Sequence, residues 1–270
     1  MSQSIPQSPL TAEHRKQFEE EGYCILKSVI PERYLTILRD ECQTFIDKMH
    51  ADMDARGTDS LGISHRNRRY FVSLRHMESE RVPEVVYSPF MASVAIDLLG
   101  PDVYLFFEQY VVKGTDKRSK FAWHQDSGYV GFDHPPYLTC WLALDDVSVE
   151  NGTVYVLPYD RAPNGRDLVE HWQDPEMNDR VGYDGDDPGE PVIVPAGSIA
   201  LFTSRTFHRS GPNLTNQMRR IYLLQYGKEP VIDPEGRFNG LNVPFVKNGE
   251  IVYDRDEAMR LAGPRDLPLG

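Results

Sequence analysis

The chain contains 270 residues, of which 40% are hydrophobic, and carries a formal net charge of −12. That length can bury a full core as one domain, no apolar run approaches the roughly 20 residues needed to span a membrane, and the polar N-terminus lacks an apolar leader. The acidic charge argues against a nucleic-acid partner, which needs a basic face to neutralise phosphates. We therefore expect one soluble, cytoplasmic domain over 1–270, with neither a membrane nor a nucleic-acid partner.

Two helices are predicted in the first part of the chain, 1–102. Apolar residues recur at spacings of three and four along 31–49, which predicts an amphipathic helix that is entered through its proline and packs on a sheet. Ser88 as N-cap and Gly100 just past the end predict a second helix over 89–99.

From residue 103 onward the sequence changes to short β-rich runs separated by turns. Many short strands favour a sandwich or barrel over a parallel βαβ sheet, and a jelly roll fits best. Asn248-Gly249 between apolar residues predicts a hairpin, because this pair accepts the positive φ angles of a tight turn. The predicted strands are 104–112, 137–144, 153–157, 191–194, 199–203 and 221–226.

Residues 158–190 are rich in Asp, Gly and Pro and lack a clear period, which predicts a long loop. Loops of this length often cover active sites. The expected layout is a helical part at 1–102, a jelly-roll core at 103–228 that contains this loop, and a C-terminal hairpin region at 229–270.

Two histidines and one aspartate form the most informative pattern of the chain. A strand repeats its side-chain direction every second residue, so His124 and Asp126 can face the same way and bind one metal, with His208 as third ligand. Two imidazoles and one carboxylate leave open coordination positions. That arrangement suits Fe(II), which must also bind a co-substrate and dioxygen.

An arginine completes the pattern, because Arg219 follows His208 by eleven residues (219 − 208) and opens another apolar run. Its planar, permanently charged guanidinium matches the distal carboxylate of 2-oxoglutarate. Arg220 is its neighbour, and on a strand only one of the two can face the interior; the spacing favours Arg219. His-x-Asp alone arises by chance in a chain with 8 His and 41 Asp and Glu residues, but the ordered combination is much harder to obtain accidentally.

Further segments extend the pattern along the chain, namely Phe-Glu-Glu-Glu-Gly-Tyr-Cys-Ile-Leu at 18–26, Trp-His-Gln-Asp at 123–126, Asn-Gly-Thr-Val-Tyr-Val-Leu-Pro at 151–158 and His-Arg-Ser-Gly-Pro-Asn at 208–213. Together they resemble the phytanoyl-CoA dioxygenase family of iron and 2-oxoglutarate oxygenases. The resemblance implies a mainly β fold, a double-stranded β-helix (jelly roll, cupin-like) with N-terminal helices packed on one sheet. It also implies that His124, Asp126 and His208 bind Fe(II), and that Arg219 with Ser210 holds 2-oxoglutarate.

The same resemblance implies further pocket residues. Thr139 is expected near the co-substrate, and Gln125, Trp141 and Gln109 are expected to line the pocket beside the iron. The chain departs from relatives after Pro158, where Tyr159 replaces the glycine that relatives often have, so the shape of the following loop is left open.

A basic cluster at 65–69, His-Arg-Asn-Arg-Arg, stands out in an otherwise acidic chain. It could receive an anionic group of the substrate, although a solvated loop is the simpler interpretation. Arg75 could reach the site or pair with one of the many acids. The expected substrate contacts are Gln109, Arg75 and Arg69.

The resemblance implies a dioxygenase that uses Fe(II), 2-oxoglutarate and O2 to hydroxylate or desaturate an aliphatic C–H bond of a small-molecule metabolite, with release of succinate and CO2. Asp126 disfavours halogenation, since halogenating relatives have a small residue there. One alternative is a cupin-like metal-dependent isomerase or hydrolase, which would leave Arg219 and Ser210 without a role. The other is a non-catalytic small-molecule-binding barrel, which would leave an intact triad unused. We expect a monomer or homodimer.

Overall fold

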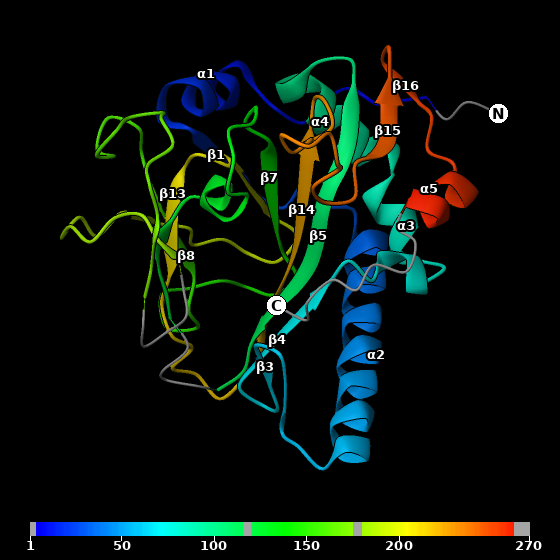
Figure 1. Ribbon diagram of the computed structural model, residues 1–270, viewed down its shortest axis with the longest axis vertical. Helices are drawn as coiled ribbons and strands as arrows, with labels where there is room; N and C mark the ends of the chain where they lie inside the picture. The colour runs from blue at the N-terminus through cyan, green and yellow to red at the C-terminus, as the bar shows by residue number, and fades with distance from the viewer. Residues whose placement is uncertain (1–3, 116–119, 175–179, 262–270) are drawn as a thin grey trace.

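The computed structural model of the chain describes residues 4–115, 120–174 and 180–261. Two antiparallel β-sheets face each other, and helices cover the outer face of the larger sheet (Figure 1). The larger sheet has the order β1 (Tyr23–Leu26), β12 (Ile199–Thr203), β7 (Leu138–Ala143), β14 (Arg219–Gly227), β5 (Val103–Lys113), β4 (Arg69–Ser73), β3 (Ser64–His65) and β2 (Ser60–Leu61), with β15 (Val243–Lys247) joining β5 to β16 (Glu250–Ile251). The smaller sheet has the order β11 (Glu190–Pro191), β8 (Val154–Leu157), β13 (Phe207–Ser210) and β6 (Phe121–His124).

The core has two layers, and the alternation of side chains along each strand assigns residues to one or the other. On β5, Tyr110 and Val112 pack against the helices, whereas Phe107 and Val111 point toward the smaller sheet. The inter-sheet layer also receives Val156 from the smaller sheet. This face-to-face packing of two antiparallel sheets is the predicted jelly roll, and the inward face of the larger sheet forms one wall of the site described below.

Both predicted helices are present. In α4, Ser88 accepts a hydrogen bond from the backbone N–H of Met91, and Gly100 follows the last helical residue, as predicted. The helix predicted at 31–49 ends seven residues later (56 − 49), because Met53 extends its buried stripe before Gly57 ends it in the left-handed conformation, at φ 61°. The helices are α1 (Ala12–Glu21), α2 (Glu32–Arg56), α3 (Val82–Val86), α4 (Pro89–Leu99) and α5 (Arg255–Leu261), with short 3-10 turns η1 (His76–Glu78) and η2 (Asp126–Tyr129).

The expectation that helices come first and strands follow is wrong. Strands β1 to β4 all lie before residue 103, interleaved with helices. β1 pairs with β12, so that Tyr23 faces Phe202, and β4 extends the sheet beside β5. These segments are too short to show a period by themselves, and their partners are distant in the sequence, which hides them from local patterns.

The six predicted strands agree with observed ones within two residues, except at 191–194, where β11 covers only Glu190–Pro191 and an isolated bridge joins Val194 to Val147. The segment 158–190 is not structureless, since β9 (Trp172–Gln173) pairs with β10 (Arg180–Val181). The predicted hairpin is confirmed, because Asn248 and Gly249 connect β15 and β16 with φ angles of 51° and 78°. None of the described helices is long and apolar enough to cross a membrane.

Candidate metal centre

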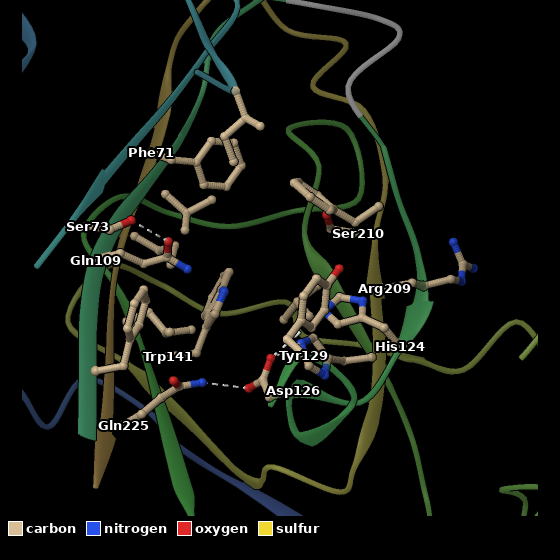
Figure 2. A pocket seen from close by; sticks show the side chains of 18 of the residues that line it. Phe71, Ser73, Gln109, His124, Asp126, Tyr129, Trp141, Arg209, Ser210 and Gln225 are labelled. Carbon is tan, nitrogen blue, oxygen red and sulfur yellow. Dashed lines mark hydrogen bonds and ion pairs between the residues drawn. The ribbon is translucent and has the colours of Figure 1, made fainter. Parts of the chain in front are cut away.

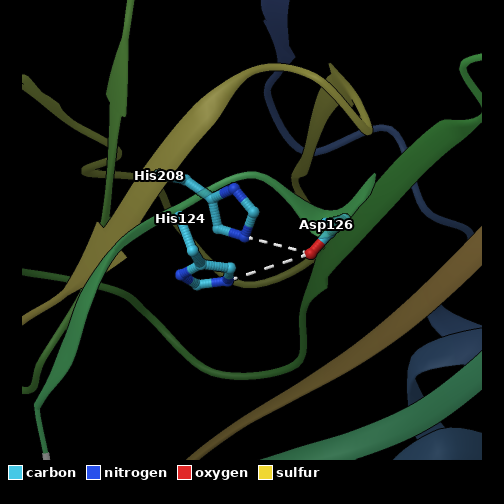
Figure 3. Close-up of side chains that lie close together, drawn as sticks. All are labelled: His124, Asp126 and His208. Atoms are coloured by element: carbon cyan, nitrogen blue, oxygen red, sulfur yellow. Dashed lines mark ion pairs between the residues drawn. The ribbon is translucent and has the colours of Figure 1, made fainter. Parts of the chain in front are cut away.

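Three side chains from two strands and one turn converge at the inner face of the smaller sheet (Figure 3). His124 ends β6 and pairs directly with His208 on β13, while Asp126 begins η2 two residues later. The His208 Nε2 and His124 Nε2 atoms lie 3.4 and 3.9 Å from Asp126 Oδ1. All three ligand atoms lie within 4.8 Å of one another, a spacing that one transition-metal ion can bridge.

The remaining polar atoms of the triad are bonded to the protein. His124 Nδ1 lies 2.9 Å from the carbonyl of Ala122, and His208 Nδ1 lies 3.1 Å from that of Thr206. Donation from Nδ1 to a carbonyl selects the tautomer whose Nε2 lone pair points to the centre. The protein therefore orients both imidazoles for metal binding.

The aspartate is oriented in the same way. Asp126 Oδ2 accepts hydrogen bonds from Thr139 Oγ1 and from Gln225 Nε2, both at 2.8 Å. This leaves Oδ1 directed at the two histidines (Figure 2 shows the bond from Gln225). Two neutral nitrogens and one carboxylate oxygen on one side of a site are the donor set of a ferrous facial triad, so the residues fit Fe(II).

Burial and mutual charge set the protonation of the triad. Burial, with the neighbouring His208, lowers the pKa of His124 to about 3, so this imidazole is neutral. Burial alone would lower the pKa of His208, but the Asp126 carboxylate outweighs it and raises that pKa. Burial would raise the pKa of Asp126, but the two imidazoles outweigh it and lower that pKa, so the carboxylate is ionised.

Arg219 lies on β14 in the wall of the same cavity, with 2% of its surface exposed. Its Nη2 donates to the carbonyl of Gly152 at 2.7 Å, while Nε and Nη1 have no partner among the described residues. Burial lowers the pKa of this guanidinium to about 10, so it stays charged near neutral pH. Buried, unpaired donors on a cation are costly unless a ligand completes them, and a carboxylate would do so.

Arg220 has the opposite environment. Its Nε and Nη2 atoms bond both oxygens of Asp145, at 3.0 and 2.7 Å. It does not line the cavity. The strand alternation therefore separates the two arginines as expected, one facing the interior and the other paired at the surface.

Ser210 lines the cavity beside Arg219. Its Oγ accepts a hydrogen bond from Lys113 Nζ at 2.8 Å, and the same ammonium donates to the carbonyl of Gly211. Lys113 ends β5 directly opposite Arg219 on β14. This end of the cavity thus combines two buried cations with a hydroxyl, whereas the metal end carries the carboxylate.

The cavity has a volume of about 600 Å³ and is walled mainly by aromatic and aliphatic side chains (Figure 2). Trp141, Gln109 and Arg69 lie on its wall, together with the triad, Ser210 and Arg219. Its size is that of a small-molecule site and leaves room for a substrate beside 2-oxoglutarate.

Comparison with known proteins gives the family. The model of the phytanoyl-CoA dioxygenase family (PhyH) matches residues 18–221. The chain belongs to the phytanoyl-CoA dioxygenase family. The predicted family, oxygenase class and cofactors are confirmed.

Relatives are similar along much of the chain. A probable alpha-ketoglutarate-dependent hypophosphite dioxygenase of Stutzerimonas stutzeri is 25% identical over 281 residues, covering 96% of this chain and 93% of the relative. The L-proline trans-4-hydroxylase of Streptomyces griseoviridis is 25% identical and covers 57% of this chain and 65% of the relative.

Solved structures share the fold, which confirms the predicted jelly roll. The non-heme alpha ketoglutarate dependent carbocyclase SnoK from nogalamycin biosynthesis has a TM-score of 0.62 at 20% identity and covers 93% of this chain and 97% of that one. EvdO2 from Micromonospora carbonacea var. aurantiaca, complexed with 2-oxoglutarate, has a TM-score of 0.58 at 22% identity and covers 83% of this chain and 93% of that one.

Gln125 does not line the cavity of this phytanoyl-CoA dioxygenase family member. It is fully buried on the other side of the segment, because it lies between two residues that face the metal. Its Nε2 donates to the carbonyls of Asp167 and Arg205, and its Oε1 accepts from the N–H of Val169. His171 Nε2 accepts from the Gln125 backbone N–H at 3.0 Å. Gln125 therefore ties the 158–190 segment to the metal-ligand segment.

Two other expected contacts also lie elsewhere. Thr139 is buried behind Asp126 and bonds that carboxylate instead of lining the cavity. Arg75 is outside the site, because both oxygens of Glu78 bind its guanidinium at 2.6 Å and its side chain packs over Phe45. Of the two alternatives for Arg75, pairing with an acid is therefore the one that the structure shows.

Sequence reasoning missed Gln225 and Lys113. Gln225 lies six residues after Arg219 on β14 and faces the same way. Strand alternation could therefore have indicated Gln225, had the sequence shown that one strand contains both residues. Lys113 follows an apolar run and gives no local signal, because only the register of β5 against β14 places it beside Arg219.

Proposed function

We propose that this protein is an Fe(II)- and 2-oxoglutarate-dependent dioxygenase that oxidises an aliphatic C–H bond of a small-molecule metabolite. In the hydroxylation, one oxygen atom of O2 enters the new C–OH group and the other enters succinate, while the C1 carboxylate of 2-oxoglutarate leaves as CO2. The observation that carries the proposal is the coexistence, in one cavity, of the oriented triad and the buried, unpaired donors of Arg219.

Each residue has a separate task. His124, Asp126 and His208 would hold iron, which when bound supplies the activation of dioxygen and leaves positions for the 2-oxo acid end of 2-oxoglutarate. Arg219 and Ser210 would bind the distal carboxylate and so fix the co-substrate across the cavity. Trp141 lies on the cavity wall and would exclude water from one side.

The proposed product type rests on Asp126. A carboxylate ligand occupies the position that halogenating relatives keep small, which favours hydroxylation or desaturation over halogenation. Solved neighbours include a carbocyclase and an epimerase, so the fold serves several oxidative outcomes. Mass spectrometry of the product distinguishes them, because hydroxylation adds one oxygen atom and desaturation removes two hydrogens.

The test is a measurement of O2 consumption and succinate formation with Fe(II), 2-oxoglutarate and a panel of metabolites. We expect 2-oxoglutarate to give a visible charge-transfer absorption on the Fe(II)-loaded protein, and a substrate to accelerate succinate release. A metal-dependent isomerase or hydrolase would turn over its substrate without 2-oxoglutarate. A non-catalytic barrel would bind small molecules without forming succinate.

We also propose that the protein is a monomer or homodimer that acts in the cytoplasm. Its three cysteines are buried free thiols, which suits a reducing compartment where iron stays ferrous. Light scattering on the purified protein tests the assembly, since a larger oligomer would contradict it, and fluorescence microscopy of a tagged chain tests the location.

A further inference from the structure

Three basic residues form a row across the cavity wall. In the sheet register, Lys113 on β5 lies opposite Arg219 on β14 and, on its other side, opposite Arg69 on β4. Residues directly opposite one another on neighbouring strands share a face of the sheet, so the three side chains project in the same direction. A row of three cations on one wall is unusual in a chain whose net charge is −12.

Two members of this row already have tasks. Lys113 donates to Ser210 and to the carbonyl of Gly211. Arg219 and Ser210 are the proposed binding site of the 2-oxoglutarate distal carboxylate, and the inference rests on that proposal. A single distal carboxylate at Arg219 and Ser210 leaves Arg69, two strands away, for another ligand.

Arg69 is held in place but not neutralised. Its Nε donates to the carbonyl of Ile63 at 2.8 Å, and its guanidinium lies 5.9 Å from the ring centre of Phe71. Among residues 4–115, 120–174 and 180–261, no carboxylate pairs with it, and its two terminal nitrogens have no hydrogen-bond partner. Arg66 in the same basic cluster differs, because Asp54 and Asp59 both bind it.

The wall between the cationic row and the metal is mostly apolar. The next row on the same face contains Ile221, Val111 and Phe71, and the one after it contains Leu223 and Gln109. Gln109 accepts a hydrogen bond from Ser73 and points into the cavity (Figure 2). A ligand that extends from Arg69 toward the metal therefore meets a charge, then an apolar surface, and then a polar amide.

We propose that the substrate is a small carboxylic acid with an aliphatic or aromatic body, whose carboxylate binds Arg69. The planar fork of Arg69 matches a carboxylate, and Phe71, Val111 and Phe121 line the space for the body. In this orientation the end of the body away from the carboxylate reaches the metal, and Gln109 contacts it on the way. The acidic protein disfavours a polyanion in place of a single carboxylate.

The experiment compares acids with their primary amides, which have nearly the same shape but no charge. The probes are 3-phenylpropanoate, octanoate and the two corresponding amides, titrated by calorimetry into protein loaded with Ni(II), which is redox-inert here, and 2-oxoglutarate. We expect at least one acid to bind about tenfold or more tightly than its amide, because a charged hydrogen-bonded pair is lost in the amide. In Arg69→Gln that preference should disappear, and in Arg69→Lys it should be partly retained.

Arg66→Gln is the matched control, since Arg66 belongs to the same cluster, is paired with two acids and does not line the cavity; it should keep the preference for acids. The titration of 2-oxoglutarate, made before the acids are added, separates two failures. If 2-oxoglutarate does not bind, the proposed function fails. If it binds but both acids bind no better than their amides, or if Arg69→Gln weakens 2-oxoglutarate binding and leaves the acid preference intact, the assignment of Arg69 is wrong.

Discussion

The two ends of the cavity differ in how far the protein itself completes their hydrogen bonds. At the metal end, both imidazole Nδ1 atoms face backbone carbonyls and the second oxygen of Asp126 accepts two bonds. At the cationic end, the described residues leave Nε and Nη1 of Arg219 without partners. The first end is preorganised for an ion of fixed geometry, whereas the second is completed by ligands that bring their own acceptors. Changes at the first end should abolish the chemistry, and changes at the second should alter affinity.

The largest effect is expected from His208→Ala. It removes one of three metal ligands, so we expect no stoichiometric iron binding and a fall in succinate formation to background. Metal analysis after desalting and a succinate assay measure both. His14→Gln is the matched control, because His14 lies in the capping box of α1, where glutamine is also suited, and this variant should behave like the wild type.

A smaller effect, confined to affinity, is expected at the cationic end. Arg219→Gln should raise the KM for 2-oxoglutarate about a hundredfold, since it removes a charged, desolvated partner of the carboxylate. Iron content should not change. Arg220→Gln is the neighbouring control and should leave this KM unchanged; a larger effect at Arg220 than at Arg219 would contradict the register of β14.

The support of Asp126 can be weakened without touching a ligand. Thr139→Val has nearly the same shape and removes one of the two bonds to Oδ2. We expect metal affinity to fall about tenfold to a hundredfold, as is typical when the partner of a metal ligand is lost. Competition with a chelator measures the change, and wild-type affinity in both Thr139→Val and Gln225→Leu would show that the triad is rigid without them.

The smallest effect on the site is expected from Gln125→Leu. It removes the partner of three partly buried hydrogen-bonding groups and should lower the free energy of unfolding by about 1–3 kcal/mol. Hydrogen exchange should rise at Val169, whose N–H loses its acceptor. Gln217→Leu, at an exposed position, is the control. A loss of 2-oxoglutarate affinity at unchanged stability would instead restore Gln125 to the co-substrate site.

Local patterns predicted the parts that depend on neighbouring residues. Three features involve only a few adjacent positions and could be predicted from the sequence: the spacing of His124 and Asp126, the caps of α4, and the Asn248-Gly249 turn. Arg219 was separable from Arg220 for the same reason, since alternation along a strand is a local property.

Contacts that depend on the register between distant strands could not be predicted from the sequence. Lys113 bonds to Ser210, which lies 97 residues later in the sequence, and β1 pairs with β12, which is also distant in the sequence. The family resemblance implied that Gln125 lines the pocket, yet the same alternation that points its neighbours inward turns it outward. Thr139 donates to Asp126 because the turn η2 directs this carboxylate toward it, and the spacing of residues in the sequence does not reveal that direction.

The bond between Lys113 and Ser210 has a consequence for recognition. An ammonium group can only donate, so the Ser210 oxygen must accept, and the single hydroxyl proton is left to point elsewhere. Beside it, the free positions of Arg219 are also donors. This end of the cavity is therefore dominated by donors. A carboxylate accepts at both of its oxygens, whereas a terminal amide would set its NH2 group against these donors, so the selection of a doubly charged co-substrate over its monoamide follows from hydrogen-bond polarity as well as from charge.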